Sequence, residues 1–358
     1  MSRGPYPETK NKTKMAHGGQ ETKQGTIWKT DRFATHDGPG IRTTLYFKGC
    51  PLRCRWCSNP EGQAPEPSLV LVKADCNGCG LCVAACSTQA LELPQPADRA
   101  SATVQVNRSK CNLCGACAAV CPARALQIWG QSYSVSDLLE ILEKDRLIHK
   151  RTGGGLTCTG GEPLYQAEFL LELLEECHRQ SIHTAVETCA YADEGVFKAV
   201  LQVVDWLFID LKHIESNMHK VFVGKSNELI LRNTRLASSI LRARSKALVI
   251  RMVVVPRIND GQNISDMADF LCSLPLVTMV ELLPYHRYGI YKYDLLGRCY
   301  GLTDVEPPSA EVMGKYKKLL EDRGLPVVLR KARAKSELPP SRVVHLSFLI
   351  TTSIRARR

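Results

Sequence analysis

The chain has 358 residues, of which 44% are hydrophobic, and this is enough for one large α/β barrel or two ordinary domains. No run of about 18 apolar residues occurs, so we expect no transmembrane helix. The net charge of +11 comes mostly from the two ends, because residues 1–25 carry +3 and residues 330–358 carry +7. The body is nearly neutral, and we therefore expect no nucleic-acid partner and no membrane partner.

Sixteen cysteines are present, and the first 25 residues are polar, with no apolar signal core. In a long chain without a signal peptide, many cysteines predict metal ligation in a reducing cytoplasm and argue against disulfide bonds. Residues 1–25 are expected to form a disordered basic tail, and residues 330–358 a basic C-terminal extension.

The first motif is a loop of three cysteines after a short strand. Asp37–Gly40 predicts a tight turn, and the β-branched run Thr43–Phe47 predicts a strand. Cys50, Cys54 and Cys57 follow with the spacing C-x3-C-x2-C. Three thiolates can hold three corners of a four-iron cluster, which leaves either an open iron or a distant fourth cysteine. A zinc knuckle is the alternative, although zinc loops usually read C-x2-C twice.

Two further cysteine runs each read C-x2-C-x2-C-x3-C. This is the spacing of bacterial two-cluster ferredoxins, in which the fourth cysteine of each run ligates the other cluster. Residues 69–129 are therefore predicted to be a ferredoxin-like insert, with a linking loop at residues 94–102. The predicted ligands are Cys76, Cys79, Cys82 and Cys121 for one cluster, and Cys111, Cys114, Cys117 and Cys86 for the other.

After the insert, helical and strand patterns alternate. The predicted helices are residues 135–150, 169–177, 194–204, 229–242, 264–272 and 308–323. The predicted strands are residues 155–159, 183–187, 206–210, 248–255 and 279–283, which with residues 43–47 make six. Such alternation predicts the α/β class, with a partial (β/α)6 barrel related to the eight-unit TIM barrel. The barrel is expected to comprise residues 26–68 and 130–329.

The distinctive polar residues all follow predicted strands. The C-terminal ends of barrel strands meet on one face, where active sites lie, so we predict an enzyme. Taken singly, Glu162 could be a helix N-terminal acid, Asp210 and Lys212 a surface pair, and His286 a structural histidine. The remaining cysteines are not expected to be ligands, and they are Cys158, Cys177, Cys189, Cys272 and Cys299.

Together these stretches resemble the radical S-adenosylmethionine (SAM) superfamily and, more closely, its glycyl-radical-enzyme activating enzymes. The resemblance runs from about Ile27 to Leu329. The chain resembles a longer branch of this family. That branch carries a ferredoxin-like insert, which the pyruvate formate-lyase activating enzyme lacks. The matching stretches are Asp37–Arg42, Lys48–Glu61, Gly153–Pro163, Asp210–His213 and Leu282–His286.

The resemblance implies three [4Fe-4S] clusters, one of which is held by Cys50, Cys54 and Cys57 and binds SAM at its open iron. Reductive cleavage of SAM would give methionine and a 5′-deoxyadenosyl radical, which removes a hydrogen from a backbone glycine of a partner glycyl radical enzyme. Flavodoxin or ferredoxin is the implied electron donor. The protein is expected to be a monomer in the cytoplasm of an anaerobe.

The resemblance also implies roles for single residues. A monovalent cation is implied at Glu187 and Asp210, and Lys212 and His286 join the three cysteines as catalytic residues. The residues implied to bind the cofactor are Asn59, Gly160, Gly161, Glu162, Glu187, Asp210, Lys212 and His286. The rim that faces the partner's glycine loop is implied to be Asp37, Gly38, Pro39, Gly40 and Arg42.

Two alternative functions are weighed against the activase. A ferredoxin domain on an inert barrel would be an electron-transfer protein, and it would not need the residues from Gly160 to Glu162 or from Asp210 to His286. A radical SAM enzyme could act on another protein or small molecule, but Asp37–Arg42 and Pro284–His286 argue against it.

Overall fold

The computed structural model describes residues 23–94 and 103–330. Most of the predicted N-terminal tail, nearly all of the linking loop and the extension from residue 331 onward lie outside the described residues. In the part of the chain that is described, no helix has the length and apolar character needed to cross a membrane.

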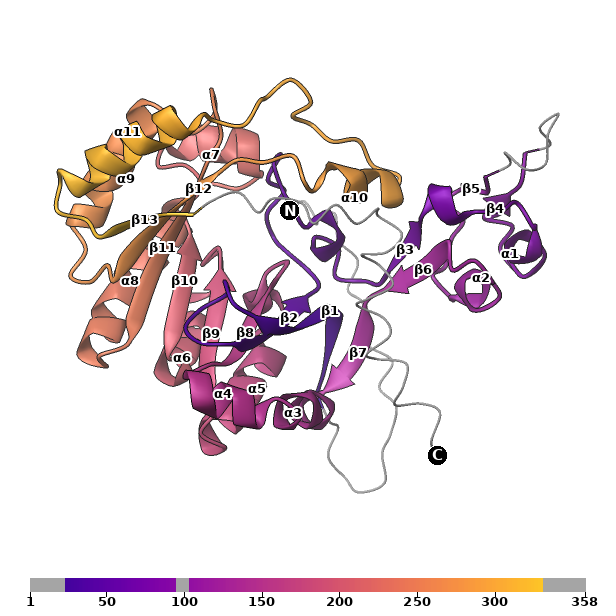
Figure 1. Cartoon of the computed structure of the whole chain (residues 1–358), viewed down its shortest axis with the longest axis horizontal. Helices are drawn as coiled ribbons and strands as arrows, with labels where there is room; N and C mark the ends of the chain where they lie inside the picture. Colours follow the sequence, from indigo (N-terminus) through magenta and orange to yellow (C-terminus); the bar gives the residue numbers. More distant parts are fainter. Residues whose placement is uncertain (1–22, 95–102, 331–358) are drawn as a thin grey trace, which may run out of the picture.

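Nine strands form one open, curved sheet, whose edges are β7 (Gln131–Ser134) and β13 (Val327–Leu329) (Figure 1). The six predicted strands lie side by side within this sheet, and all neighbours among them are parallel. The first and last residue of each strand agree with the prediction to within one residue. The prediction of a partial barrel is confirmed. The six strands are β2 (Arg42–Phe47), β8 (Gly155–Gly160), β9 (His183–Thr188), β10 (Trp206–Asp210), β11 (Ala247–Val254) and β12 (Met279–Pro284).

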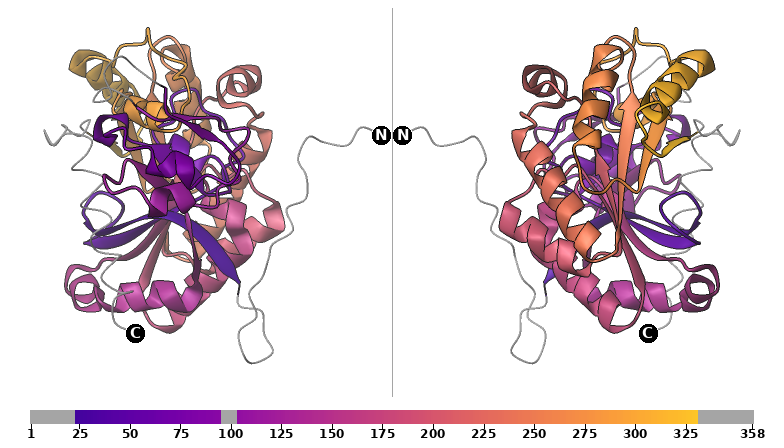
Figure 2. Two further views of the ribbon diagram at one scale, coloured as in Figure 1. Left: turned by 90° about the vertical axis from the view of Figure 1, so that its right-hand side faces the viewer. Right: turned by 90° about the vertical axis from the view of Figure 1, so that its left-hand side faces the viewer.

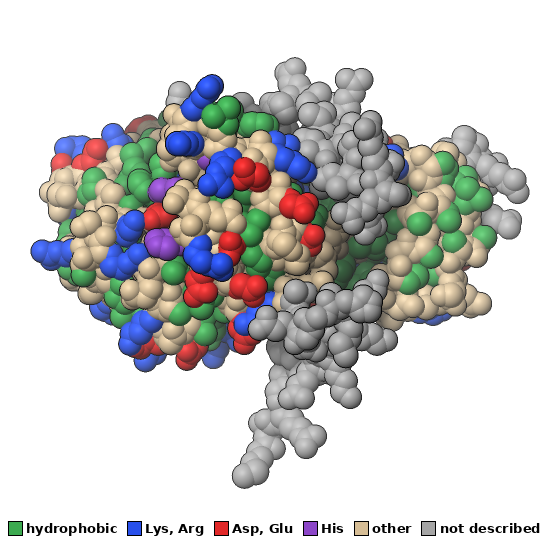
Figure 3. Space-filling model, turned by 90° about the horizontal axis from the view of Figure 1, so that it is seen from below, with side chains coloured by type: hydrophobic (Ala, Val, Ile, Leu, Met, Phe, Trp, Pro, Cys, Tyr) green, Lys and Arg blue, Asp and Glu red, His purple; other side chains and the backbone are tan. Residues whose placement is uncertain are grey.

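Helices cover the outer face of the sheet (Figure 2). In α5 (Ala167–Arg179) the buried residues recur at helical spacing, from Phe169 to the fully buried Cys177, so one face packs on the strands. The outward faces, seen from below in Figure 3, carry charges of both signs, whereas the insert shows few. The other long helices are α3 (Val135–Glu143), α6 (Glu194–Val203), α8 (Glu228–Ala243), α9 (Gln262–Cys272) and α11 (Ala310–Glu321).

The prediction of a single helix over residues 135–150 is wrong, because the chain breaks into α3 and α4 (Arg146–Thr152). Asp145, at the break, is only 3% exposed. Its carboxylate accepts hydrogen bonds from Arg32 Nε (2.8 Å) and Thr43 Oγ1 (2.7 Å), which draw the chain toward the sheet. Leu147, in α4, is 62% exposed, so the apolar face of α3 does not continue along α4.

Strand β1 (Gln24–Ala34) pairs antiparallel with both β2 and β7, and the sequence did not predict it. Residues 24 and 25 therefore lie in the sheet, although they were predicted to belong to the N-terminal tail. The register of β1 against β2 shifts between Ile27 and Lys29 and again between Asp31 and Ala34. These shifts interrupt the two-residue alternation from which a strand is recognised.

The insert projects from one side of the barrel (Figure 1) and has its own small apolar core. Its stem is the antiparallel pair β3 (Ser68–Leu71) and β6 (Leu126–Trp129). These strands lie at the predicted boundaries, residues 69 and 129. The remaining elements of the insert are α1 (Leu81–Ala84), β4 (Leu91–Glu92), β5 (Gln105–Val106) and α2 (Ala116–Ala119).

Candidate active site

The loop of Cys50, Cys54 and Cys57 leaves the end of β2 and is fixed by backbone hydrogen bonds. Arg53 N donates to Val223 O (2.8 Å), and Arg55 N donates to Phe222 O (3.0 Å), both at the end of α7 (Ser216–Val223). Cys50 N donates to Gln63 O (3.1 Å). The loop is therefore tied both to the barrel and to the chain that leaves it.

The three thiols of this loop share one partly buried site. Burial raises the pKa of Cys54 to about 12 and that of Cys57 to about 11. Burial also acts to lower the pKa of Lys212, but Asp210 and Cys54 outweigh it and raise that pKa, so the lysine stays charged. Such thiols become thiolates only beside a strong positive charge, and bound iron would supply it. The donor set therefore fits a metal cluster.

Gly160 ends β8, Gly161 follows it, and both pack directly against the flanks of the cysteine loop. A Cβ atom on Gly161 would lie 2.2 Å from Gly62 O and 2.4 Å from Gly49 O. Gly160 has a φ of +117°, and its Cβ would lie 2.4 Å from Phe47 N. Only glycine permits this approach of backbone to backbone, so these residues set the position of the cysteine loop.

Glu162 is 1% exposed and accepts three hydrogen bonds from the chain itself. The donors are Leu164 N (3.0 Å), Thr188 Oγ1 (2.7 Å) and Cys189 N (2.7 Å). Burial raises the pKa of this carboxyl. Glu162 thus caps the short 3-10 helix Pro163–Gln166 and links it to the end of β9. Its contact with SAM stays a prediction.

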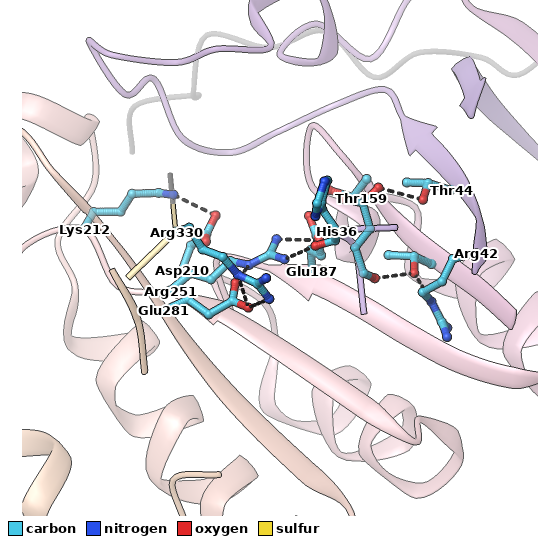
Figure 4. Close-up of polar contacts among 12 residues, drawn as sticks. His36, Arg42, Thr44, Thr159, Glu187, Asp210, Lys212, Arg251, Glu281 and Arg330 are labelled. Atoms are coloured by element: carbon cyan, nitrogen blue, oxygen red, sulfur yellow. Dashed lines mark hydrogen bonds and ion pairs between the residues drawn. The ribbon is translucent and has the colours of Figure 1, made fainter. Parts of the chain in front are cut away.

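Glu187 and Asp210 each lie beside a cationic side chain (Figure 4). Glu187 forms an ion pair with Arg251, whose Nε also donates to Glu281 Oε2 (2.8 Å). Lys212 Nζ donates to Asp210 Oδ2 (2.9 Å). The carboxylates expected to bind a monovalent cation are therefore already neutralised by the protein.

His286 follows β12 and lies with its ring stacked on Tyr288, at 4.7 Å between ring centres. Its Nδ1 atom is buried and has no hydrogen-bond partner within the described part of the chain. Burial lowers the pKa of this histidine. A buried, unpaired nitrogen at a strand end fits a site that receives a polar ligand such as SAM.

The turn at Asp37–Gly40 is partly exposed just before the start of β2, whereas Arg42, predicted for the same rim, is fully buried. Arg42 NH1 donates to Pro39 O (3.0 Å). The turn is further held by Thr157 Oγ1, which donates to Asp37 O (2.7 Å), and by Thr44 Oγ1, which donates to Asp37 Oδ2 (2.9 Å). Arg42 therefore supports the turn from within the protein and does not present its side chain to a partner.

The eight cysteines of the insert line two separate cavities. Among the described residues, no three His, Cys, Asp or Glu side chains are grouped so that they could hold a single metal ion. The sulfurs surround hollows instead, as a cluster requires, and the grouping is the crossed one that the spacing predicts. One cavity is lined by Cys76, Cys79, Cys82 and Cys121, and the other by Cys86, Cys111, Cys114 and Cys117.

Sequence reasoning missed four residues at this site. Cys189 is 6% exposed and lies against Cys50, whose pKa it lowers. Lys292 and Tyr293 contact the end of the cysteine loop, and nothing in their local sequence marks them. Arg251 had a signal, because a charge inside a buried strand predicts a buried partner.

Comparisons with known proteins identify two regions and several relatives. Residues 108–271 match the Radical SAM superfamily, and residues 75–125 match the 4Fe-4S dicluster domain. The 4-hydroxyphenylacetate decarboxylase activating enzyme of Clostridioides difficile is 35% identical over 311 residues, which cover 86% of this chain and 96% of that protein. The benzylsuccinate synthase activating enzyme of Thauera aromatica is 37% identical over 308 residues, covering 85% and 92%.

Among solved structures, a domain of a pyruvate-formate lyase-activating enzyme from Bacteroides vulgatus is 34% identical. It aligns with a TM-score of 0.42 and covers 50% of this chain and 99% of that domain. The match to the dicluster domain confirms the ferredoxin-like character of the insert.

Proposed function

Since this chain belongs to the radical SAM activating enzymes of glycyl radical enzymes, we propose that its cysteine loop, Lys212 and His286 form the site at which SAM binds and is cleaved. When bound, the reduced cluster and SAM supply the 5′-deoxyadenosyl radical that removes a hydrogen from a backbone glycine of the partner enzyme. The observation that carries the site proposal is the meeting of the partly buried thiols of the cysteine loop with the charged Lys212. His286 adds an unpaired nitrogen just after β12.

The side chains have separate tasks in this proposal. Cys50, Cys54 and Cys57 ligate the cluster, and the ammonium of Lys212 offsets the negative charge of their thiolates. His286 offers Nδ1 to the ligand. The partial burial of the group limits the access of water, which protects a reactive radical from side reactions.

We further propose three four-iron clusters, two of them in the cavities of the insert. The insert would comprise residues 69–129, and the barrel residues 26–68 and 130–329, with a tail at 1–25 and an extension at 330–358. A flavodoxin or ferredoxin as electron donor, a monomeric state and a cytoplasmic location remain part of the proposal. The crossed grouping of cysteines around the cavities supports the count of clusters.

The monovalent cation implied by the resemblance does not fit the site as formed. Arg251 pairs with Glu187, and Lys212 pairs with Asp210. A metal ion would first have to displace one of these side chains. We assign no step to such an ion.

The test is anaerobic. The protein is loaded with iron and sulfide, reduced, mixed with SAM and assayed for 5′-deoxyadenosine, beside the variants Cys54→Ala and Cys272→Ala. Cys272 is exposed and lies outside the site, so its variant controls for the loss of a thiol. We expect product from the wild type and Cys272→Ala, and none from Cys54→Ala. A fully reduced protein with about twelve irons that forms no product would refute the proposal and favour an electron carrier.

A further inference from the structure

Lys292 lies on α10 (Ile290–Leu295), a short helix that follows His286 in the chain. Its ammonium reaches the chain that leaves the cysteine loop. Nζ donates to Ser58 O (3.0 Å), Asn59 Oδ1 (2.9 Å) and Glu61 Oε1 (2.6 Å). A lysine has three N–H donors, so all of them are used on three acceptors within four residues.

This contact is shielded from water. The side chain of Lys292 is 16% exposed and that of Glu61 is 0% exposed. Among the described residues, Lys292 is the only cation that forms an ion pair with Glu61. A buried carboxylate needs such a partner, and the ion pair therefore holds the lysine in one place.

Neighbours of Lys292 hold the same stretch of chain. Tyr293 Oη donates to Cys57 O (3.0 Å), and Arg298 NH1 donates to Pro60 O (3.1 Å). The carbonyls of Cys57, Ser58 and Pro60 thus all accept hydrogen bonds from residues 292–298. The segment holds the exit of the cysteine loop at successive points.

The contact with Asn59 has a consequence for chemistry. Because Oδ1 accepts from Lys292, the Nδ2 donors of the amide point elsewhere. Within the described part of the chain, Nδ2 donates to no protein atom, and the residue is only partly buried. An oriented and unused amide donor two residues after Cys57 is suited to an acceptor atom on a ligand of the cluster site.

We propose that Lys292 is a positioning residue for SAM, because it fixes the amide of Asn59 in the orientation that donates to the cofactor. The inference rests on the proposed function, since Asn59 acts in it as a contact of SAM. Lys292 itself touches neither the cluster ligands' sulfurs nor the reacting atoms, and its effect passes through Asn59.

The experiment measures the affinity of the iron-loaded protein for SAM by equilibrium binding, together with the electron paramagnetic resonance spectrum of the reduced protein with SAM added. Lys292→Met keeps the aliphatic stem and removes the donors, and it should weaken SAM binding roughly tenfold. Lys292→Arg, which keeps charge and donors, should recover part of the loss. Lys317→Met removes a lysine from a surface pair with Glu321 on α11 and should bind like the wild type.

A double-mutant cycle with Asn59→Ala separates positioning from a general structural effect. If Lys292 acts through Asn59, Lys292→Met should change SAM affinity less than about twofold in the Asn59→Ala background. A further tenfold loss there would overturn the inference, as would wild-type affinity in Lys292→Met alone.

Two results distinguish the inference from its premise. A wild type that neither binds nor cleaves SAM refutes the proposed function, whereas a competent wild type with an unaffected Lys292→Met refutes only the role of Lys292. Should Lys292→Met lose iron, Lys292→Gln, which keeps an amide donor, enters the same cycle with the same expected result.

Discussion

Replacing Gly161 by alanine should destabilise the protein by about 3 kcal/mol. The added Cβ would lie 2.2 Å from Gly62 O and 2.4 Å from Gly49 O, far inside contact distance. Adding atoms to a well-packed site usually costs about 1–3 kcal/mol. Because both obstructing atoms are main-chain oxygens that cannot rotate away, we expect the upper end of that range.

The assay is thermal unfolding of the iron-loaded protein, followed anaerobically by circular dichroism. At about 2 °C per kcal/mol, the expected loss is roughly 6 °C in Tm. Gly314→Ala is the matched control, since nothing lies within 4 Å of its Cβ and it sits inside α11, where alanine should gain ~0.5–1 kcal/mol. Since Gly49 precedes Cys50, Gly161→Ala should also lower the yield of 5′-deoxyadenosine. Equal Tm values for the two variants would refute this reasoning.

Three further predictions concern the clusters, the cation and pH. About four irons should be lost from Cys121→Ala and also from the double variant Cys76→Ala/Cys121→Ala, because both cysteines line one cavity. About eight irons should be lost from Cys111→Ala/Cys121→Ala, because these two cysteines line different cavities. Equal losses from the two double variants, measured by iron analysis, would contradict the crossed grouping. Exchange of K⁺ for Na⁺ or tetramethylammonium should change the rate of SAM cleavage by less than about twofold, because Glu187 is already paired with Arg251. A tenfold dependence of the rate on the cation would exclude this ion pair in solution. Burial lowers the pKa of Lys48 to about 8 from 10.5, so at this group the unfolded chain binds more protons between these values. The contribution of Lys48 to the free energy of unfolding should therefore rise by up to ~3 kcal/mol as pH rises through them. Lys48→Met should remove this rise in denaturant titrations, and an unchanged pH dependence would contradict the assignment.

The parallel strands could be predicted because each is a short β-branched run bounded by turn residues. The crossed grouping of the insert cysteines could also be predicted, since ligand spacing reports it directly. Strand β1 could not, because its register shifts at Lys29 hide the alternation. The break at Asp145 depends on Arg32, more than 100 residues away, and no local pattern contains that contact.

For the candidate site, sequence predicts which residues belong to it better than it predicts how their side chains are oriented and paired. The resemblance implied that Arg42 belongs to the rim that faces the partner, but sequence cannot tell whether a side chain points outward or into the protein. The resemblance implied a monovalent cation at Glu187, and no local pattern shows that Glu187 pairs with Arg251, because the two residues lie on different strands. Lys292 was missed for a similar reason, because its hydrogen bond to Asn59 joins residues that are 233 positions apart in the sequence.

The stem of the insert bears on how such a domain could be transplanted. Ser68 pairs with Trp129, so the chain leaves and re-enters the barrel at one point and could be joined there to another scaffold. Yet Leu295 and Leu296 of the α10 region pack against Val70 and Trp129 of the stem. A graft of residues 68–129 alone would leave this apolar face without its counterpart. The transplantable cassette is therefore the insert together with α10, and deleting the insert would remove a support of α10 as well as the two cysteine-lined cavities.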